Sequence, residues 1–473
     1  MREVTRKELV VGAAATALGA AGVYELVERL GGSAPKRAVG TPPPEPEQHL
    51  LQGVRVIEDN GAEVLVPPLH HAILTARVRV AERRADLRAA QQAFDQSLHE
   101  LDADYAATPA GLGVTVAWGL PYMKRFVPGL LAEHLPRDRR ASRAKRKEVP
   151  ALLDAVRFPS DPDATILEDN DVAVLLRSDD PKHIADAEKR LFDRHRDLFE
   201  VTSIRRGFAG GGFDGGIGLP KKLALAAGVP GADLIPNGAE LFLGFTSTLK
   251  ANLGPSRIAN LETLGYADLR SGYFRHGTAM HLSHIDEDLE RWYLNTDYDQ
   301  RVATTFRPGL HVPDGTQTVP QGPHGVSSQA AVTRGLQRYG VLGHSASIQT
   351  TSRLLAEVAG PDGTVYARGT AIPQRADFNT LDAPFAWSVQ PQRDGLSDTP
   401  SAGVHFVVFN PTSDDFHRNR LAMDGHLPDG TILPVEQSDE AQGINAVLRT
   451  THRQNFIVPP RAHRSFPLVE LLS

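Results

Sequence analysis

The sequence contains no cysteine, and this absence removes several kinds of chemistry at once. Disulfide bonds, thiolate nucleophiles, iron–sulfur clusters and zinc–thiolate sites all need cysteine, as does haem attached through a Cys-x-x-Cys-His motif. Any metal site would therefore have to rely on His, Asp, Glu or Tyr side chains.

An excess of positive charge is also absent. The 51 Lys and Arg residues and 57 Asp and Glu residues give a formal net charge of −6, and the pI is near 6.3. Phosphate binding favours a basic surface, so we do not expect nucleic acid as the main partner. The 473 residues, 41% hydrophobic and 23% charged, are ordinary for a soluble chain of two or three domains.

The apolar run from Leu9 to Tyr24 is too short and too rich in Ala and Gly for a membrane span. It follows Arg2, Arg6 and Lys7, and a basic segment before a short apolar run is typical of an export signal. We therefore interpret residues 1–30 as an export signal. Arg6-Lys7 resembles a twin-arginine pair with Lys in the second position, so a Sec-type signal, an uncleaved anchor and a buried helix remain the alternatives.

Residues 31–62 contain five prolines between Pro35 and Pro46, which predicts a disordered linker. The first folded half, residues 63–206, then shows strand, helix, strand, insert, strand, helix and strand in that order, which is the ferredoxin-like plan. Alternation and helical spacing give these elements as His71–Val80, Glu82–Asp104, Gly113–Gly119, Asp171–Leu176, Pro181–His195 and Phe199–Ile204.

The insert, residues 122–169, carries a basic run from Arg137 to Lys147. It is either a site for an anionic partner or a solvated face. The second half, residues 207–473, repeats the order of strands and helices less clearly and shows no close sequence repeat. Its expected strands are Glu240–Phe245, Gly277–Ser283 and Gly403–Phe409, and its expected helices are Ile285–Asn295 and Asp414–Leu421.

A glycine-rich segment, Gly207 to Pro220, directly follows the fourth strand. It lacks the Gly-Lys-Ser/Thr ending of a Walker loop, and no alternating βαβ pattern surrounds it as in a dinucleotide site. Its glycines permit close backbone approach to a flat ligand. The alternative is a flexible connector between the halves.

Within this segment, Gly211-Gly-Phe-Asp214-Gly215 resembles the Gly-x-x-Asp-Gly motif of the dye-decolourising (Dyp-type) peroxidases. In that family the motif lies between two ferredoxin-like halves, over one face of a haem. Further segments are similar to the family, and the resemblance covers roughly residues 70 to 425. They are Asn237–Phe245, Ile285–Trp292, Ala371–Asn379 and Gly403–Phe409.

This resemblance implies an α+β fold of two tandem ferredoxin-like halves with antiparallel sheets, like a dimeric α+β barrel. It also implies haem b and a peroxidase that reduces hydrogen peroxide and oxidises an organic donor. His344 matches the iron ligand, Asp214 the distal acid and Arg375 the distal arginine, with Gly211 and Gly215 beside the haem. A homodimer is left open.

The implied roles are chemically coherent. A neutral imidazole is a standard axial ligand of haem iron. Asp214 would move a proton between the peroxide oxygens, and Arg375 would stabilise the negative charge that develops. The plainer interpretations are that Asp214 caps a turn and that Arg375 is an ion-pair partner. A haem-binding protein without strong turnover is the alternative function.

A competing set of candidate metal ligands is His276, His281, His284 and Asp286. On a helix, His281 and His284 would share one face, as a non-haem metal site requires. On a strand, the same spacing would place them on opposite faces. The sequence leaves both interpretations open.

Overall fold

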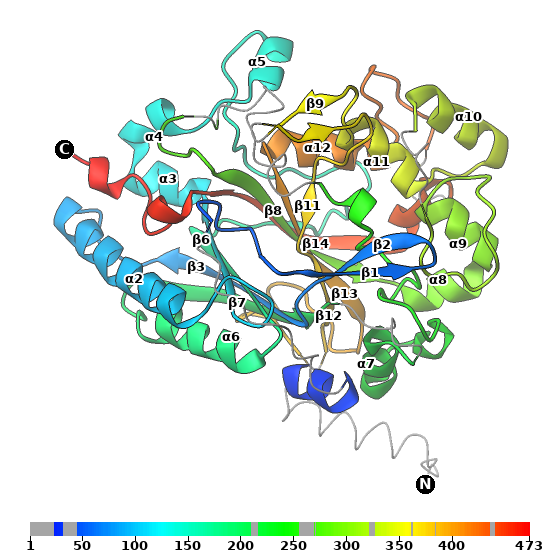
Figure 1. The fold of residues 1–473 in the computed structure, drawn as a ribbon, viewed down its shortest axis with the longest axis horizontal. Coiled ribbons are helices and arrows are strands. Elements are labelled where there is room, and N and C mark those ends of the chain that lie inside the picture. Colours follow the sequence, from blue (N-terminus) through cyan, green and yellow to red (C-terminus); the bar gives the residue numbers. More distant parts are fainter. Residues whose placement is uncertain are drawn as a thin grey trace.

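A computed structural model gives the fold in Figure 1. The residues that it describes are 23–31, 45–209, 216–254, 269, 271–320, 327–360, 363–383, 385–435 and 440–473. At the centre lies one antiparallel-dominated β-structure to which both halves of the chain contribute.

The first half forms a four-stranded antiparallel sheet in the order β7-β3-β6-β4. Helices α2 and α6 cover one side of it (Figure 1), and a π-helical turn extends α6 to Asp193. The elements confirm the predicted order, within a few residues at each end. They are β3 (His70–Val78), α2 (Arg84–Asp104), β4 (Gly113–Gly119), β6 (Val172–Ser178), α6 (Pro181–Glu188) and β7 (Phe199–Phe208).

The second half repeats this plan, with its strands in the equivalent order β14-β8-β13-β12. Between its first and second strands the chain makes a long excursion of four helices. The elements are β8 (Thr278–Glu287), α8 (Leu289–Asn295), α9 (Tyr298–Thr305), α10 (Gln329–Tyr339), α11 (His344–Ser352), β12 (Phe378–Leu381), β13 (Ala402–Asn410), α12 (Ser413–Met423) and β14 (Leu448–Val458).

The two sheets join at both edges and close a barrel of eight strands. At one seam Phe208 of β7 pairs with Asn379 of β12. At the other, Gly119 and Trp118 of β4 pair with Phe456 and Ile457 of β14. Each seam joins the fourth strand of one half to the second strand of the other. The expected α+β fold of two tandem ferredoxin-like halves is therefore confirmed.

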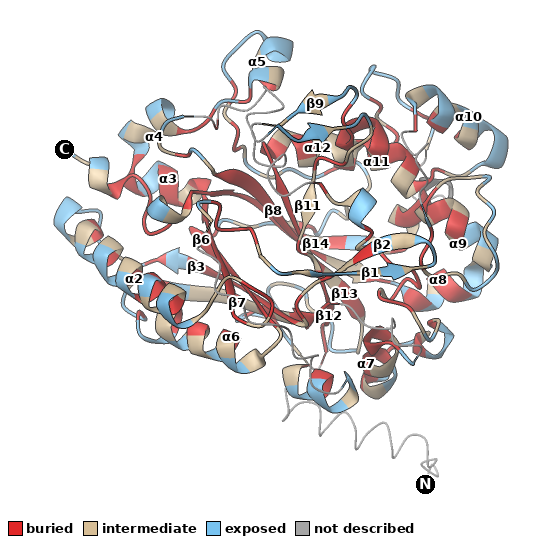
Figure 2. Ribbon diagram, in the orientation of Figure 1, coloured by how far each residue is buried: buried red, intermediate tan, exposed pale blue. Residues whose placement is uncertain are grey.

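Side chains alternate along the strands between two apolar cores, one outside the barrel and one inside it. The strands that carry them are largely buried (Figure 2). The outer face of the first sheet packs on the α2 stripe that contains Leu87, Phe94 and Leu101. The opposite face points into the barrel, where Ile73, Leu175, Leu282, Val407 and Phe456 form an apolar centre. This alternation is what period-2 patterning requires of a sheet buried on both faces.

Smaller elements surround the barrel. The insert folds as three short helices and one short strand, and the hairpin of β1 and β2 precedes the first half. The remaining elements are β1 (Arg55–Asp59), β2 (Ala62–Val66), α3 (Leu120–Phe126), α4 (Pro128–His134), α5 (Arg139–Lys145), β5 (Ile166–Leu167), α7 (Leu219–Ala227), β9 (Val358–Ala359), β10 (Val365–Tyr366) and β11 (Gln374–Arg375).

Two expected elements of the second half are wrong. Residues 240–245 form a turn instead of a strand: Leu241 N donates to Phe245 O at 3.2 Å, and Gly244 has a φ of +92°. The helix expected from Ile285 starts at Leu289, because β8 continues to Glu287. Asp288 then caps the helix by accepting from Arg291 N.

Residues 23–31, at the end of the expected export signal, form a helix whose Val23, Leu26 and Val27 are buried. They belong to an apolar cluster with Leu219 and Leu223 of α7. The second part of the expected linker is also structured, because β1 lies within it. Among the described residues, no helix combines the length and apolar character of a membrane span.

Candidate functional site

His344 is the first residue of α11, directly after Gly343, which precedes the helix in an extended conformation. The residue is half-buried, and no described residue hydrogen-bonds its buried Nδ1 atom. Burial lowers the pKa of His344 to about 4, with further contributions from the positive charges of Arg375 and Arg420. The imidazole is therefore neutral at physiological pH, the form in which it can bind a metal ion.

Arg375 lies on β11, which pairs with β13 and continues the line of β12. Its side chain is one-quarter exposed, with Nε 3.9 Å from Oδ1 of Asp377. The Nη2 group donates to the backbone oxygen of Ser247. The guanidinium is thus held at the edge of the second sheet, and its charge reaches His344.

Arg420 lies on α12, which packs against α11, and its charge contributes to the lowered pKa of His344. The two helices are joined by a hydrogen bond of 2.6 Å from Thr351 to Asn419. Arg420 Nη1 pairs with Asp424 Oδ1 at 2.7 Å. Positive charges on β11 and α12 therefore act together on the imidazole at the start of α11.

Two further charged residues near Arg375 were not predicted from the sequence. Glu240 is buried, and it accepts from Ser247 N at 2.9 Å and from Thr248 Oγ1 at 2.8 Å. Burial raises the pKa of Glu240, although its hydrogen bonds and the Arg375 charge oppose this. Burial lowers the pKa of Arg353 to about 10, and the Arg375 charge adds to the effect.

The other resemblance-based site residues, Asp214, Gly211 and Gly215, lie outside the described residues. Their placement beside His344 and Arg375 stays a prediction.

The residues that are described fit a haem in two respects. His344 offers a neutral imidazole whose buried Nδ1 is engaged by no group of the described residues, as axial ligation of iron requires. Arg375 provides a nearby cation, held by one backbone oxygen. A carboxylate that orients the ligating imidazole through its second ring nitrogen is the usual third component, and among the described residues no carboxylate pairs with His344 in this way.

The fold does not bring the competing candidate metal ligands on and before β8 together. His281 and His284 both lie on β8 but point to opposite faces, as the extended alternative predicted. His281 bonds Asn455 and stacks on Phe416, whereas His284 points into the barrel. Asp286 pairs with Arg449. In the described part of the chain, no three His, Asp or Glu side chains are grouped as metal ligands.

The barrel interior instead contains a buried cluster of aromatic rings that sequence reasoning missed. His284, His405 and Trp387 have ring centroids 5.0 to 5.6 Å apart, and His452 lies 4.9 Å from Trp387. The guanidinium of Arg205 lies 4.4 Å from a Trp387 ring centroid. Burial lowers the pKa of His405 and of His452, the latter to about 3. No sequence motif marks this cluster, because its members come from several strands and from the segment after β12 that contains Trp387.

Comparison with known proteins gives one sequence-level match. A family model described as "Family of unknown function (DUF7405)" matches residues 68–460. No curated protein matches.

Solved structures with similar folds include several peroxidases. A putative Dyp-type peroxidase from Shewanella oneidensis has a TM-score of 0.48 and 13% identity, over 86% of this chain and 96% of that one. A DyP-type peroxidase from Cellulomonas bogoriensis has a TM-score of 0.46 and 17% identity, over 88% and 96%. A DypB variant from Rhodococcus jostii in complex with heme has a TM-score of 0.46 and 11% identity, over 84% and 96%.

Proposed function

The chain belongs to the DUF7405 family, a family of unknown function, and we propose that it is a haem-dependent peroxidase with His344 as the iron ligand. The observation that carries the proposal is the state of His344. Its imidazole is held neutral, and its buried Nδ1 has no hydrogen-bond partner among the described residues. An unpaired buried nitrogen costs about 1–3 kcal/mol, and a metal ligand bond would remove that cost.

In this proposal haem b supplies the iron centre that accepts peroxide and exchanges electrons with an organic donor. The chain's own groups position the reactants. Arg375, fixed by Ser247 O, would offer N–H donors to negative charge that develops on a peroxide oxygen. Asp214, in the glycine-rich connector, would accept and return a proton.

The first test is the absorption spectrum of the purified full-length chain titrated with haemin. We expect a Soret band that saturates at one haem per chain in the wild type and is lost in His344→Ala. His311→Ala is the matched control, because His311 is exposed and distant in sequence from α11. No Soret band in the wild type, or an unchanged band in His344→Ala, would show the ligand assignment to be wrong.

Turnover is tested separately with hydrogen peroxide and a chromogenic donor. Loss of a positioned charge donor costs about 10²- to 10³-fold in kcat, so Arg375→Leu should reduce turnover by that factor while the Soret band stays. Asp214→Asn should lose about 10²- to 10⁴-fold. If haem binds but neither variant changes turnover, the protein carries haem without using these groups as a peroxidase.

We also propose export through the N-terminal basic and apolar segment, residues 1–30. The burial of Val23 and Val27 against α7 favours a folded chain that keeps residues 23–31. Fractionation of the producing cell, with mass spectrometry of the mature N-terminus, tests both points. A protein found only in the cytoplasm would exclude export.

A further inference from the structure

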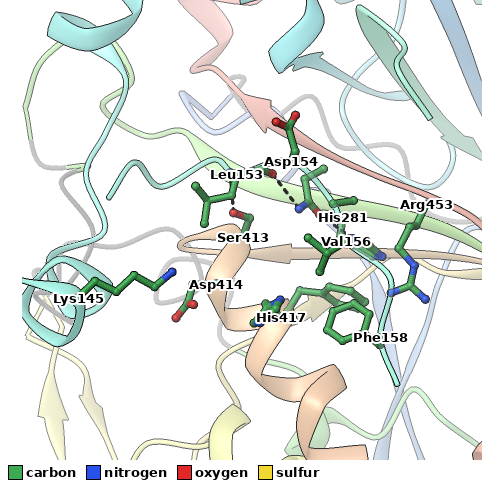
Figure 3. Close-up of a pocket in the computed structure, with 13 residues that line it drawn as sticks. Lys145, Leu153, Asp154, Val156, Phe158, His281, Ser413, Asp414, His417 and Arg453 are labelled. Carbon is green, nitrogen blue, oxygen red and sulfur yellow. Dashed lines mark hydrogen bonds between the residues drawn. The ribbon is translucent and has the colours of Figure 1, made fainter. Parts of the chain in front are cut away.

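A cavity of about 210 Å³ lies between the insert of the first half and the strands and α12 of the second half (Figure 3). Segment 153–158 of the insert forms one wall, and the N-terminal turns of α12 form another. His281 of β8 and Asn455 of β14 line it from the sheet. Neither His344 nor Arg375 lines this cavity, so it is a separate structural feature.

The walls of the cavity are aromatic and apolar. Phe158 lies 6.0 Å from Phe416 and 5.2 Å from His417, measured between ring centroids, and His281 stacks on Phe416 at 3.4 Å. Leu153 and Val156 complete the apolar surface. Aromatic rings packed at these distances favour a further flat ring in offset or edge-to-face contact.

The charges around the cavity are mostly compensated within the protein. Asp154 pairs with Lys124 at 2.9 Å, and Asp414 pairs with Arg140 at 3.0 Å. Lys145 differs: it is exposed at the rim, and within the described residues no ion pair engages it. It ends α5, in the basic run from Arg137 to Lys147, whose excess positive charge raises the local concentration of anions.

The size of the cavity limits what it can hold. An apolar cavity of about 150 Å³ accommodates benzene. A volume of about 210 Å³ leaves room for one six-membered ring and a small substituent. A drug-sized ligand needs a pocket of roughly 300 Å³ or more.

From these observations we propose that the cavity binds a single-ring aromatic carboxylate, with the ring between Phe158 and Val156 and the carboxylate at Lys145. The aromatic walls select the ring, and the unpaired ammonium group selects the acid over its neutral analogue. This inference does not depend on haem, and it gives the basic run of the insert a specific role.

The test is calorimetric titration of the full-length chain with benzoate, benzamide and acetate. We expect the wild type to bind benzoate at millimolar concentrations, about fivefold more tightly than benzamide, because an exposed ion pair contributes up to about 1 kcal/mol. Acetate, which lacks the ring, should not bind. Lys145→Ala should bind benzoate and benzamide equally, and the control Lys147→Ala should behave as the wild type.

A second variant tests the cavity itself. Val156 is 41% exposed, so Val156→Trp can fill the mouth without disturbing the core, and its circular dichroism spectrum should match the wild type. We expect this variant to bind neither aromatic ligand. Benzoate binding that survives Val156→Trp, wild-type affinity that is equal for benzoate and benzamide, or no binding of benzoate would each overturn the proposal.

Discussion

Inside the barrel, the Nε2 atom of His284 lies 3.0 Å from Oδ1 of Asp382, and both side chains are almost fully buried. His284 comes from β8, whereas Asp382 directly follows β12, two strands away. The other ring nitrogen, Nδ1, lies 2.6 Å from Oγ1 of Thr451 on β14. One imidazole therefore links three strands of the second half.

The Asp382→Ala variant should lower the free energy of unfolding by about 2–3 kcal/mol, because it leaves His284 Nε2 buried without an acceptor. Urea denaturation monitored by tryptophan fluorescence measures this. The control is Asp398→Ala, at an exposed position, for which we expect a change within about 0.5 kcal/mol. Equal stability of the two variants would show that the buried pair contributes nothing.

Stability should fall as the pH decreases below about 6.5. Burial lowers the pKa of His452 to about 3 and also lowers the pKa of His405. The positive charge of Arg205 and the neighbouring His284 lower both pKa values further. The negative charge of Asp394 opposes the shift at His452. In the unfolded chain both imidazoles regain the ordinary value near 6.5. The unfolded state then binds protons that the folded state does not. The two neutral histidines therefore contribute fully to the free energy of unfolding above pH 6.5. Below that pH the free energy of unfolding decreases toward pH 3, by about 1.4 kcal/mol per pH unit for each histidine.

His405→Phe tests this linkage. Neither ring nitrogen of His405 has a hydrogen-bond partner among the described residues, so phenylalanine should be tolerated at pH 7. Between pH 6.5 and 5 the variant should show a slope smaller by about 1.4 kcal/mol per unit. His311→Phe, at an exposed position, should keep the wild-type slope. A wild-type slope in His405→Phe would contradict the assignment.

Gly207→Ala should weaken the seam between β7 and β12. A Cβ atom at Gly207 would lie 2.1 Å from the backbone oxygen of Asn379 and 2.6 Å from the Phe378 ring. The strands would have to separate, at a cost of about 2–3 kcal/mol in the free energy of unfolding. Gly129→Ala is the matched control, because that glycine lies in α4 with open space around it. We expect it to stabilise the chain slightly.

Asp161→Ala should destabilise the contact between the insert and the second half. The carboxylate is fully buried and lies 2.5 Å from Arg453 Nη2 and 3.4 Å from Arg420 Nη2. Its removal leaves buried positive charge uncompensated, which costs about 3–5 kcal/mol. Asp163→Ala, two residues away and exposed, should be neutral. Thermal unfolding of both variants checks this, and an unchanged midpoint for Asp161→Ala would contradict it.

Most barrel strands could be predicted because their apolar side chains alternate or form short runs. β14 could not, because Arg449, His452, Arg453 and Gln454 place polar groups on both faces. The hydrogen-bond partners of those polar groups lie far away in the sequence, as when Gln454 exchanges hydrogen bonds with Asn170. Residues 240–245 give the opposite error, because their mostly apolar sequence predicts a strand that does not form. Hydrogen bonds from Ser247 and Thr248 to Glu240 stabilise a turn there instead.

The candidate site was less accessible to sequence reasoning. His344 and Arg375 are candidates only through the family resemblance, since one histidine among 18 carries no signal of its own. The cations whose charges lower the pKa of His344 come from β11 and α12, and nothing in the sequence near His344 indicates them. For His281 and His284, spacing permitted two geometries, and only the extent of β8 decided between them.

A barrel assembled from two identical subunits would present every structural feature twice, related by its symmetry axis. Here both halves belong to one polypeptide, so each is free to differ from the other. Within the described residues, the long excursion from α8 to α11 belongs to the second half and the three-helix insert to the first. Any ligand held by α11 should therefore bind with a stoichiometry of one per barrel, from one side, with no equivalent position opposite.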